Sequence, residues 1–161
     1  MLLFAIDPGS AESAYCMLDA SATPLHFAKL PNADLVSLLR NYAPSCTETV
    51  IERVASYGMP VGREVFDTCE WIGRFAQVSE DLRVPVSYVL RQEEKLAICK
   101  STKANDATIR RALIDRFARH DFSSGKGTKK NPDFFYGFKA DVWSSYAVGV
   151  THLSRRGLIW L

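Results

Sequence analysis

The chain has 161 residues, of which 47% are hydrophobic and 24% charged, and this composition suits a single globular domain spanning residues 1–161 with its own core. No apolar run approaches the roughly 20 residues of a membrane span, and no basic segment leads into a long apolar one at the N-terminus, so we expect neither a membrane protein nor a signal peptide. The cysteines are widely spaced without nearby histidines, which favours buried free thiols in a cytoplasmic, reducing compartment over disulfides or a zinc site: Cys16, Cys46, Cys69 and Cys99.

The net charge of +2 conceals an asymmetric distribution of charged residues. Residues 1–82 carry 5 Lys/Arg against 11 Asp/Glu, whereas residues 83–130 carry 12 against 5. A basic segment joined to an acidic one is typical of a protein with one face toward a polyanion. A solvated helical face would give the same pattern, so charge alone leaves both interpretations open.

The chain opens with a short apolar run that ends in Asp7, Pro8 and Gly9. A second apolar stretch follows at 14–18, so the pattern predicts a buried strand, a tight turn and a returning strand. Asp7 then stands at the end of a core strand, where a rigid element holds its carboxylate at the border with solvent. Such a carboxylate is well placed to bind a metal ion or to sit near a phosphate.

The remaining elements alternate between strand and helix patterns. Residues 62–80 predict a helix whose apolar side carries Val65, Cys69, Ile72 and Ala76, with Gly73 among them. A glycine there costs helix stability, and close approach by another helix is one compensation that the pattern suggests. The order of elements indicates an α/β fold with a mixed sheet flanked by helices. The expected strands are 2–7, 13–19, 25–29, 48–52 and 84–90, and the other expected helices are 33–42, 92–99, 106–118 and 140–154.

Two segments contain residues whose roles the pattern leaves open. Residues 123–133 are rich in Gly, Ser and Lys, and we expect a low-order, mobile loop there. The aromatic cluster at 134–138 favours core packing with one ring exposed over stacking on unpaired bases.

After Glu52, three large side chains either pack in the core or form a wedge against DNA: Tyr57, Met59 and Phe66. We interpret His120 and His152 as structural residues.

Three acids stand at the ends of separate elements: Asp7, Glu52 and Asp141. Phosphoryl hydrolysis with two divalent ions about 3.5–4 Å apart requires carboxylates that converge from different elements. Mg²⁺ favours such hard oxygen ligands. Singly, Glu52 is also compatible with a surface charge and Asp141 with a helix cap, but the set of three favours a metal site.

The acid-bearing segments resemble those of RuvC-type Holliday junction resolvases, which belong to the RNase H-like nuclease superfamily. The similarity rests on LFAIDPG at 3–9, AYC at 14–16, VIE at 50–52, KADV at 139–142 and AVGVTH at 147–152. It covers nearly the whole chain in the same order. The resemblance implies an RNase H-like fold with a five-stranded sheet, and a homodimer with much of its contact on the helix after Glu52.

The resemblance also implies catalytic roles. Asp7 is expected to bridge two Mg²⁺ or Mn²⁺ ions that Glu52 and Asp141 help to bind, and Lys95 lies where the family has a basic residue near the scissile phosphate. The family usually has a second acid one turn along the last helix, where this chain has Ser144. Either three carboxylates suffice, as in other RNase H-like enzymes, or metal binding is weaker, and the serine hydroxyl would orient a metal-bound water. Residues expected to contact DNA phosphates are Lys100, Lys103, Arg110, Lys126, Lys129 and Lys130.

The leading hypothesis is a metal-dependent endonuclease that cleaves four-way DNA junctions symmetrically as a dimer, without a nucleotide cofactor. The compact size suggests a phage or mobile-element enzyme in a bacterial cytoplasm. An actin-like kinase or ATPase also opens with a strand, an Asp and a Gly, but it needs a second lobe and a second phosphate loop. Two further alternatives are a junction-binding protein with weak or lost catalysis and a nuclease for flaps or RNA–DNA hybrids.

Overall fold

The computed structural model describes residues 1–58 and 60–161, so Met59 lies outside the described residues. Ten regular elements and one short 3-10 helix confirm the predicted sequence of strands and helices. They are β1 (Leu2–Asp7), β2 (Glu12–Asp19), β3 (Pro24–Pro31), α1 (Asn32–Tyr42), η1 (Ala43–Ser45), β4 (Glu48–Arg53), α2 (Arg63–Asp81), β5 (Val86–Leu90), α3 (Arg91–Cys99), α4 (Asp106–Phe117) and α5 (Val142–Arg155).

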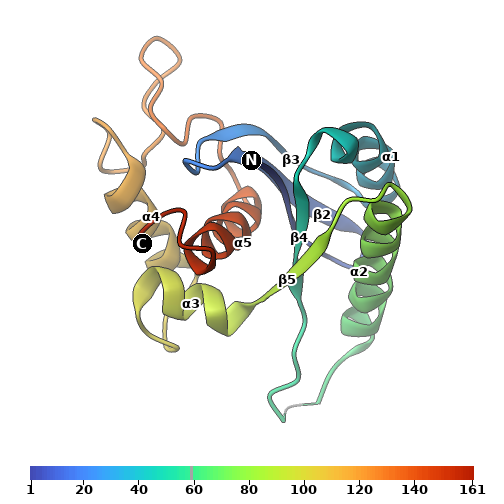
Figure 1. The fold of residues 1–161 in the computed structure, drawn as a ribbon. Helices are drawn as coiled ribbons and strands as arrows, with labels where there is room; N and C mark the ends of the chain where they lie inside the picture. Colours follow the sequence, from blue (N-terminus) through green and yellow to red (C-terminus); the bar gives the residue numbers. More distant parts are fainter. Residues whose placement is uncertain (59) are drawn as a thin grey trace.

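The five strands form one mixed sheet in the order β3-β2-β1-β4-β5. β1 pairs antiparallel with β2 and parallel with β4, and β5 runs parallel to β4. Figure 1 shows α1 and α2 on one side of the sheet and α3, α4 and α5 on the other. The predicted α/β fold with a mixed five-stranded sheet flanked by helices is therefore confirmed.

The central strand β1 is buried on both faces, which explains its continuous apolar sequence. Its alternate side chains enter different cores, because successive strand residues point to opposite faces. Leu3 and Ala5 belong to the core beneath α5, whereas Phe4 and Ile6 belong to the core beneath α1 and α2. Asp7 continues the Leu3–Ala5 face, so its carboxylate lies on the α5 side of the sheet.

α5 packs very closely on β1 and β2, and Gly149 permits this approach. A Cβ at Gly149 would lie 2.6 Å from one Leu18 methyl carbon and 3.2 Å from the Ala5 Cβ.

We expect Gly149→Ala to destabilise the protein by about 1–3 kcal/mol, since the buried leucine has no free space to enter. Denaturant unfolding checks this, with Gly73→Ala as the control, because no atom lies within 4 Å of a Cβ there. The control should leave stability unchanged or raise it by about 0.5–1 kcal/mol, and equal losses in both variants would contradict the prediction.

The first half of α2 departs from the sequence-based expectation. Cys69 is exposed and no helix approaches Gly73 in the described part of the chain, so the predicted burial of Cys69 and close helix contact at Gly73 are wrong for the single chain. Figure 1 shows why: residues 54–58 and 60–62, which lie before this end of α2, extend beyond the sheet. Tyr57 and Phe66 are also exposed, which excludes core packing for both within one chain. The buried side of α2 consists of Ile72, Phe75, Ala76, Val78 and Ser79.

Two aspartates organise the segment before α5, so the prediction of a low-order loop at 123–133 is wrong. The buried Asp133 carboxylate accepts hydrogen bonds from the backbone N–H groups of residues 119–121 and 134. The Asp121 carboxylate accepts from the backbone of 123, 124 and 127. The Ser124 hydroxyl also donates to the Asp121 carboxylate. Against the opposing effect of burial, these hydrogen bonds hold the pKa of both carboxyls well below the ordinary range. Composition hid this order, because the two acids satisfy backbone groups instead of burying apolar surface.

The aromatic cluster packs as predicted. Phe135 and Phe138 are buried against Trp143 and Tyr146 of α5, while Tyr136 is exposed. These contacts anchor the chain immediately before α5, and thereby help to position Asp141. No helix among the described residues has the length and hydropathy needed to cross a membrane.

Candidate active site

Asp7 and Glu52 are brought together by the parallel pairing of β1 and β4. Ile6 is in register with Ile51, so the next residue on each strand is the acid. Neighbouring strands lie about 4.8 Å apart, and both side chains point to the α5 face. The two carboxyl groups are close enough to share a hydrogen bond. The topology of the central strands thus creates the acidic pair.

The environment of this pair disfavours two negative charges. Burial raises the pKa of Asp7 well above its usual value, and the charges of Glu52, Asp141 and Glu94 raise it further. Burial also raises the pKa of Glu52, although Asp7 and Arg91 act in the opposite direction. Crowded carboxylates with raised pKa values are typical of functional sites and of cation sites.

Asp141 reaches the same region from the beginning of α5. Its carboxylate makes no capping hydrogen bond to the helix, so the alternative role as a helix cap is wrong. Instead, Asp141 Oδ2 lies 2.7 Å from Lys29 Nζ. The preceding residue, Ala140, has a φ of 46°, a left-handed conformation that costs a non-glycine residue roughly 1–3 kcal/mol. This turn directs Asp141 toward the sheet.

Lys29 lies in the same row of the sheet as Asp7. Asp7 is in register with Ala14 on β2, and Ala14 is in register with Lys29 on β3. All three side chains therefore point to one face, and the small alanine between them leaves room for the lysine to extend toward the acids. Lys29 consequently pairs with Asp141, with Glu12 3.7 Å away on its other side.

A fourth acid, Glu94, enters from the first turns of α3. It is fully buried, and its Oε2 lies 2.6 Å from Arg91 Nη1. Burial, together with the charge of Glu52, raises the pKa of Glu94 to about 9, against the opposing effect of Arg91. Arg91 also pairs with the exposed Asp106 of α4. Glu94 and Arg91 thus extend the charged cluster from the sheet edge to the helices.

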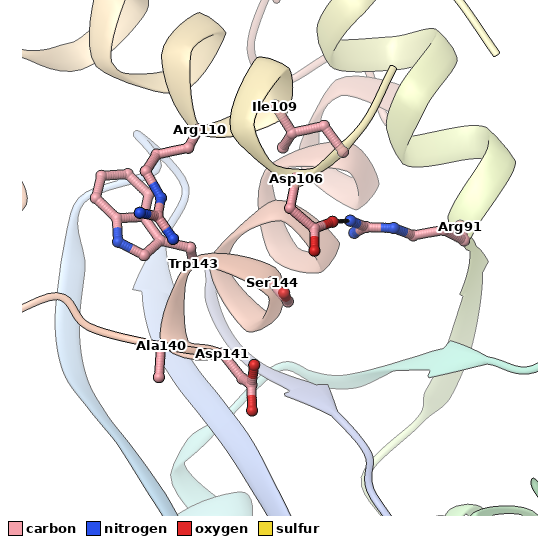
Figure 2. A pocket seen from close by; sticks show the side chains of 8 residues that line it. All are labelled: Arg91, Asp106, Ile109, Arg110, Ala140, Asp141, Trp143 and Ser144. Carbon is pink, nitrogen blue, oxygen red and sulfur yellow. Dashed lines mark hydrogen bonds and ion pairs between the residues drawn. The ribbon is translucent and has the colours of Figure 1, made fainter. Parts of the chain in front are cut away.

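A small cavity of about 130 Å³ opens beside Asp141. Figure 2 shows Arg91 reaching to Asp106 on one side and Arg110 beside Trp143 on the other, with Ser144 one turn along α5 from Asp141. The Arg110 guanidinium lies 5.2 Å from the centre of the Trp143 ring, a cation–π contact. The cavity therefore presents two arginines next to two acids, one of which, Asp106, is paired with Arg91. Its lining residues are Arg91, Asp106, Ile109, Arg110, Ala140, Asp141, Trp143 and Ser144.

The donor set fits a hard divalent cation, because it consists of carboxylates that crowd one another. As the described side chains stand, however, no three His, Cys, Asp or Glu residues enclose a common metal position. Lys29 neutralises Asp141 and Arg91 neutralises Glu94. Shared binding of a cation by Asp7, Glu52 and Asp141 therefore requires Asp141 to exchange its lysine partner for the ion.

The other predicted basic residues are not joined to the acids by any ion pair or hydrogen bond in the described part of the chain. Lys95 is half-buried on α3, and Lys100 Nζ donates to the Ala97 carbonyl oxygen at 2.8 Å. Lys103 is exposed in the turn before α4, and Arg110 lines the cavity. Lys129 and Lys130 are exposed and Lys126 half-buried in the ordered loop 123–133.

Sequence patterns did not single out Lys29, Arg91 and Glu94. In the sequence, Lys29 has the pattern of an ordinary strand residue. Glu94 is one of two acids at a helix start, where the helix dipole favours them. One signal was available for Lys29: strand alternation places it on the apolar face with Phe27, where an unpaired lysine is costly.

Comparison with known proteins bears on the fold. No protein-family model matches the chain, and no curated protein matches its sequence. The structure is similar to that of RuvC from Thermus thermophilus, at 14% identity and a TM-score of 0.64 over 98% of both chains. It is also similar to T. thermophilus RuvC in complex with Holliday junction substrate, at 14% identity and a TM-score of 0.69 over 98% of this chain and 97% of that chain. The chain therefore has the α/β, RNase H-like fold of RuvC, as predicted.

Proposed function

We propose that this chain is a divalent-metal-dependent endonuclease that cleaves four-way DNA junctions. The observation that carries the proposal is the adjacent pair of Asp7 and Glu52 at the ends of the central strands of a RuvC-like sheet, with the charge of Asp141 acting on Asp7. The neighbouring structure solved with a Holliday junction substrate supports branched DNA as the substrate class. Mg²⁺ or Mn²⁺ bound to these acids would supply an activated water and charge stabilisation for phosphodiester hydrolysis.

In this proposal, the side chains of the protein bind the cations and the DNA and orient the water. Asp7, Glu52 and Asp141 bind the cations, while Arg110 and Arg91 line the cavity where a DNA phosphate would lie. The charge of Arg91 acts on Glu52, which favours Arg91 over Lys95 as the cation close to the reacting phosphate. Ser144 would orient water near Asp141. Phosphates farther along the DNA would contact the exposed lysines at 100, 103, 129 and 130, and Lys126 beside them.

We further propose that the protein acts as a homodimer. A four-way junction is nearly two-fold symmetric, so two symmetric cuts suit a two-fold dimer. Support comes from the projecting end of α2 and the segment before it, which expose Tyr57, Val61 and Phe66. An exposed apolar surface of this kind favours association with a partner.

Cleavage of a panel of DNA substrates tests the proposal. The panel contains a four-way junction, a flap, a linear duplex and an RNA–DNA hybrid, each with Mg²⁺, with Mn²⁺ or with a chelator. We expect paired, symmetric cuts in the junction that require the metal, and at least about tenfold slower cleavage of the duplex, because junction shape allows contacts that a straight duplex lacks. Preferential cleavage of the flap or hybrid would contradict junction resolution.

Ser144 favours a second candidate function, a junction-binding protein with weak or lost catalysis. The acid that the resolvase pattern places at this position is missing, and Asp141 is paired with a lysine. The same panel separates the two functions. Tight, salt-sensitive junction binding without cleavage in either metal would support the binding protein, whereas metal-dependent cuts would support the nuclease.

A further inference from the structure

Glu94 has a feature that an ordinary helix-start acid lacks: a buried oxygen without a hydrogen-bond partner. The residue is 0% exposed, and its Oε1 has no partner among the described residues, while Oε2 pairs with Arg91. An acid at the start of a helix interacts favourably with the helix dipole while exposed at the surface, so that interaction does not explain the burial of Glu94. Buried polar atoms are nearly always paired, and an unpaired one indicates strain, a catalytic role, or a bound water or ion. Glu94 therefore requires a further explanation.

The position of Glu94 in the fold supplies that explanation. Glu52 is in register with Val89 of β5, and α3 begins directly after β5 ends. The first turns of α3 consequently lie beside the end of β4 that carries Glu52. The negative charge of Glu94 acts on Asp7, and that of Glu52 acts on Glu94, so the three carboxyl groups belong to one cluster.

We infer that Glu94 is a fourth carboxylate ligand for divalent cations, supplied by α3 in place of the acid that Ser144 replaces on α5. The inference rests on the proposed metal site. The unpaired Oε1 of Glu94 provides the ligand atom, and Arg91 acts as the partner of Glu94 before the cation binds. This arrangement would keep four carboxylates in the cluster, with a different helix supplying one of them.

Binding of Mn²⁺ to the DNA-free protein tests the role of Glu94, measured by calorimetry and by electron paramagnetic resonance of the bound ion. We expect Glu94→Gln to weaken Mn²⁺ binding at least about tenfold, as a lost ligand should. The matched control is Glu93→Gln, which makes the same substitution in the same turn of α3. Glu93 pairs with the Leu90 N–H and Arg155 rather than with the acids, so its variant should bind Mn²⁺ within twofold of the wild type.

Equal Mn²⁺ affinity in Glu94→Gln and Glu93→Gln would overturn the inference and leave Glu94 as a structural partner of Arg91. If Glu94→Gln does not fold, as judged by circular dichroism, Glu94→Asp carries the test: its shorter side chain should also weaken Mn²⁺ binding, and unchanged affinity would overturn the inference. Because no DNA is present, these results are independent of junction cleavage. Failure of the proposed function would instead appear as absent cleavage by a wild type that binds Mn²⁺ normally.

Discussion

Replacing Asp7 with asparagine should reduce junction cleavage by at least about 10³-fold. Burial raises the pKa of Asp7, and Glu52, Asp141 and Glu94 all raise it further, so Asp7 lies at the centre of the carboxylate cluster. Its loss should remove several kcal/mol of metal-mediated stabilisation of the transition state, and each 1.36 kcal/mol corresponds to a factor of ten in rate. Single-turnover cleavage of a labelled four-way junction in Mg²⁺ measures the change.

Junction binding separates a catalytic effect from a folding defect in this variant. Asp7→Asn replaces an acid of the proposed DNA-binding site with a neutral group of nearly the same shape, so the affinity of the variant for the junction should equal or exceed that of the wild type. Asp34→Asn is the matched control, because Asp34 is exposed on α1 across the sheet from the acids. A tenfold or smaller loss of cleavage in Asp7→Asn, or a comparable loss in the control, would contradict the central role of Asp7.

Replacing Glu48 with glutamine should destabilise the folded protein by about 3 kcal/mol. The Glu48 side chain is 8% exposed at the start of β4, where its Oε2 lies 3.0 Å from His152 Nε2 and 2.9 Å from Arg156 Nη1. It also accepts a hydrogen bond from Ser87. Charged hydrogen bonds of this kind contribute roughly 1.5–3 kcal/mol each, and losing one partner of a buried pair costs about 3–5 kcal/mol. Thermal unfolding should show a decrease in Tm of roughly 6–12 °C.

The loss of stability in Glu48→Gln should depend on pH, because Glu48 is ionised at a lower pH in the folded protein than in the unfolded chain. Burial alone would raise the pKa of Glu48, but Ser87, His152 and Arg156 together lower it below its ordinary value of 4.5. The stabilisation is therefore complete above about pH 4.5 and disappears as the pH falls through the lowered pKa. Urea unfolding at pH 7 and at about pH 3 measures the difference between wild type and variant at each pH.

Glu80→Gln provides the control for Glu48, since Glu80 is exposed on α2 and forms no ion pair in the described part of the chain. Its unfolding free energy should stay within about 0.5 kcal/mol of the wild type. A difference between Glu48→Gln and wild type that is the same at both pH values would show that the carboxylate charge contributes little.

Local patterns predicted most of the fold, because the sheet and helices have clear periodicities. The continuous apolar run of β1 and the following Pro8 and Gly9 indicated a central strand and turn, and the structure has both. The errors arose where tertiary context decides. The exposure of Cys69 depends on how far α2 extends beyond the sheet, and the order around Asp133 depends on hydrogen bonds to backbone distant in sequence.

The candidate site was predictable only in the residues that end strands or begin the last helix. Asp7 and Glu52 converge because β1 and β4 are parallel neighbours, a pairing consistent with the motif order. Lys29 was not predictable as a partner of Asp141, because that contact depends on the small Ala14 between β1 and β3. Glu94 was identified from its burial and its unpaired oxygen, which only the three-dimensional structure reveals.

The packing of α5 on β1 has a consequence for the synthesis of this protein. The first strand contributes Asp7 and the turn before α5 contributes Asp141, so segments far apart in the sequence must meet before the carboxylate cluster exists. During translation, the emerging polypeptide can form early strands and α1, but it lacks α5 to cover them. A nascent chain consequently lacks the carboxylate cluster, and with it the proposed nuclease activity, until α5 has been synthesised and has packed on β1.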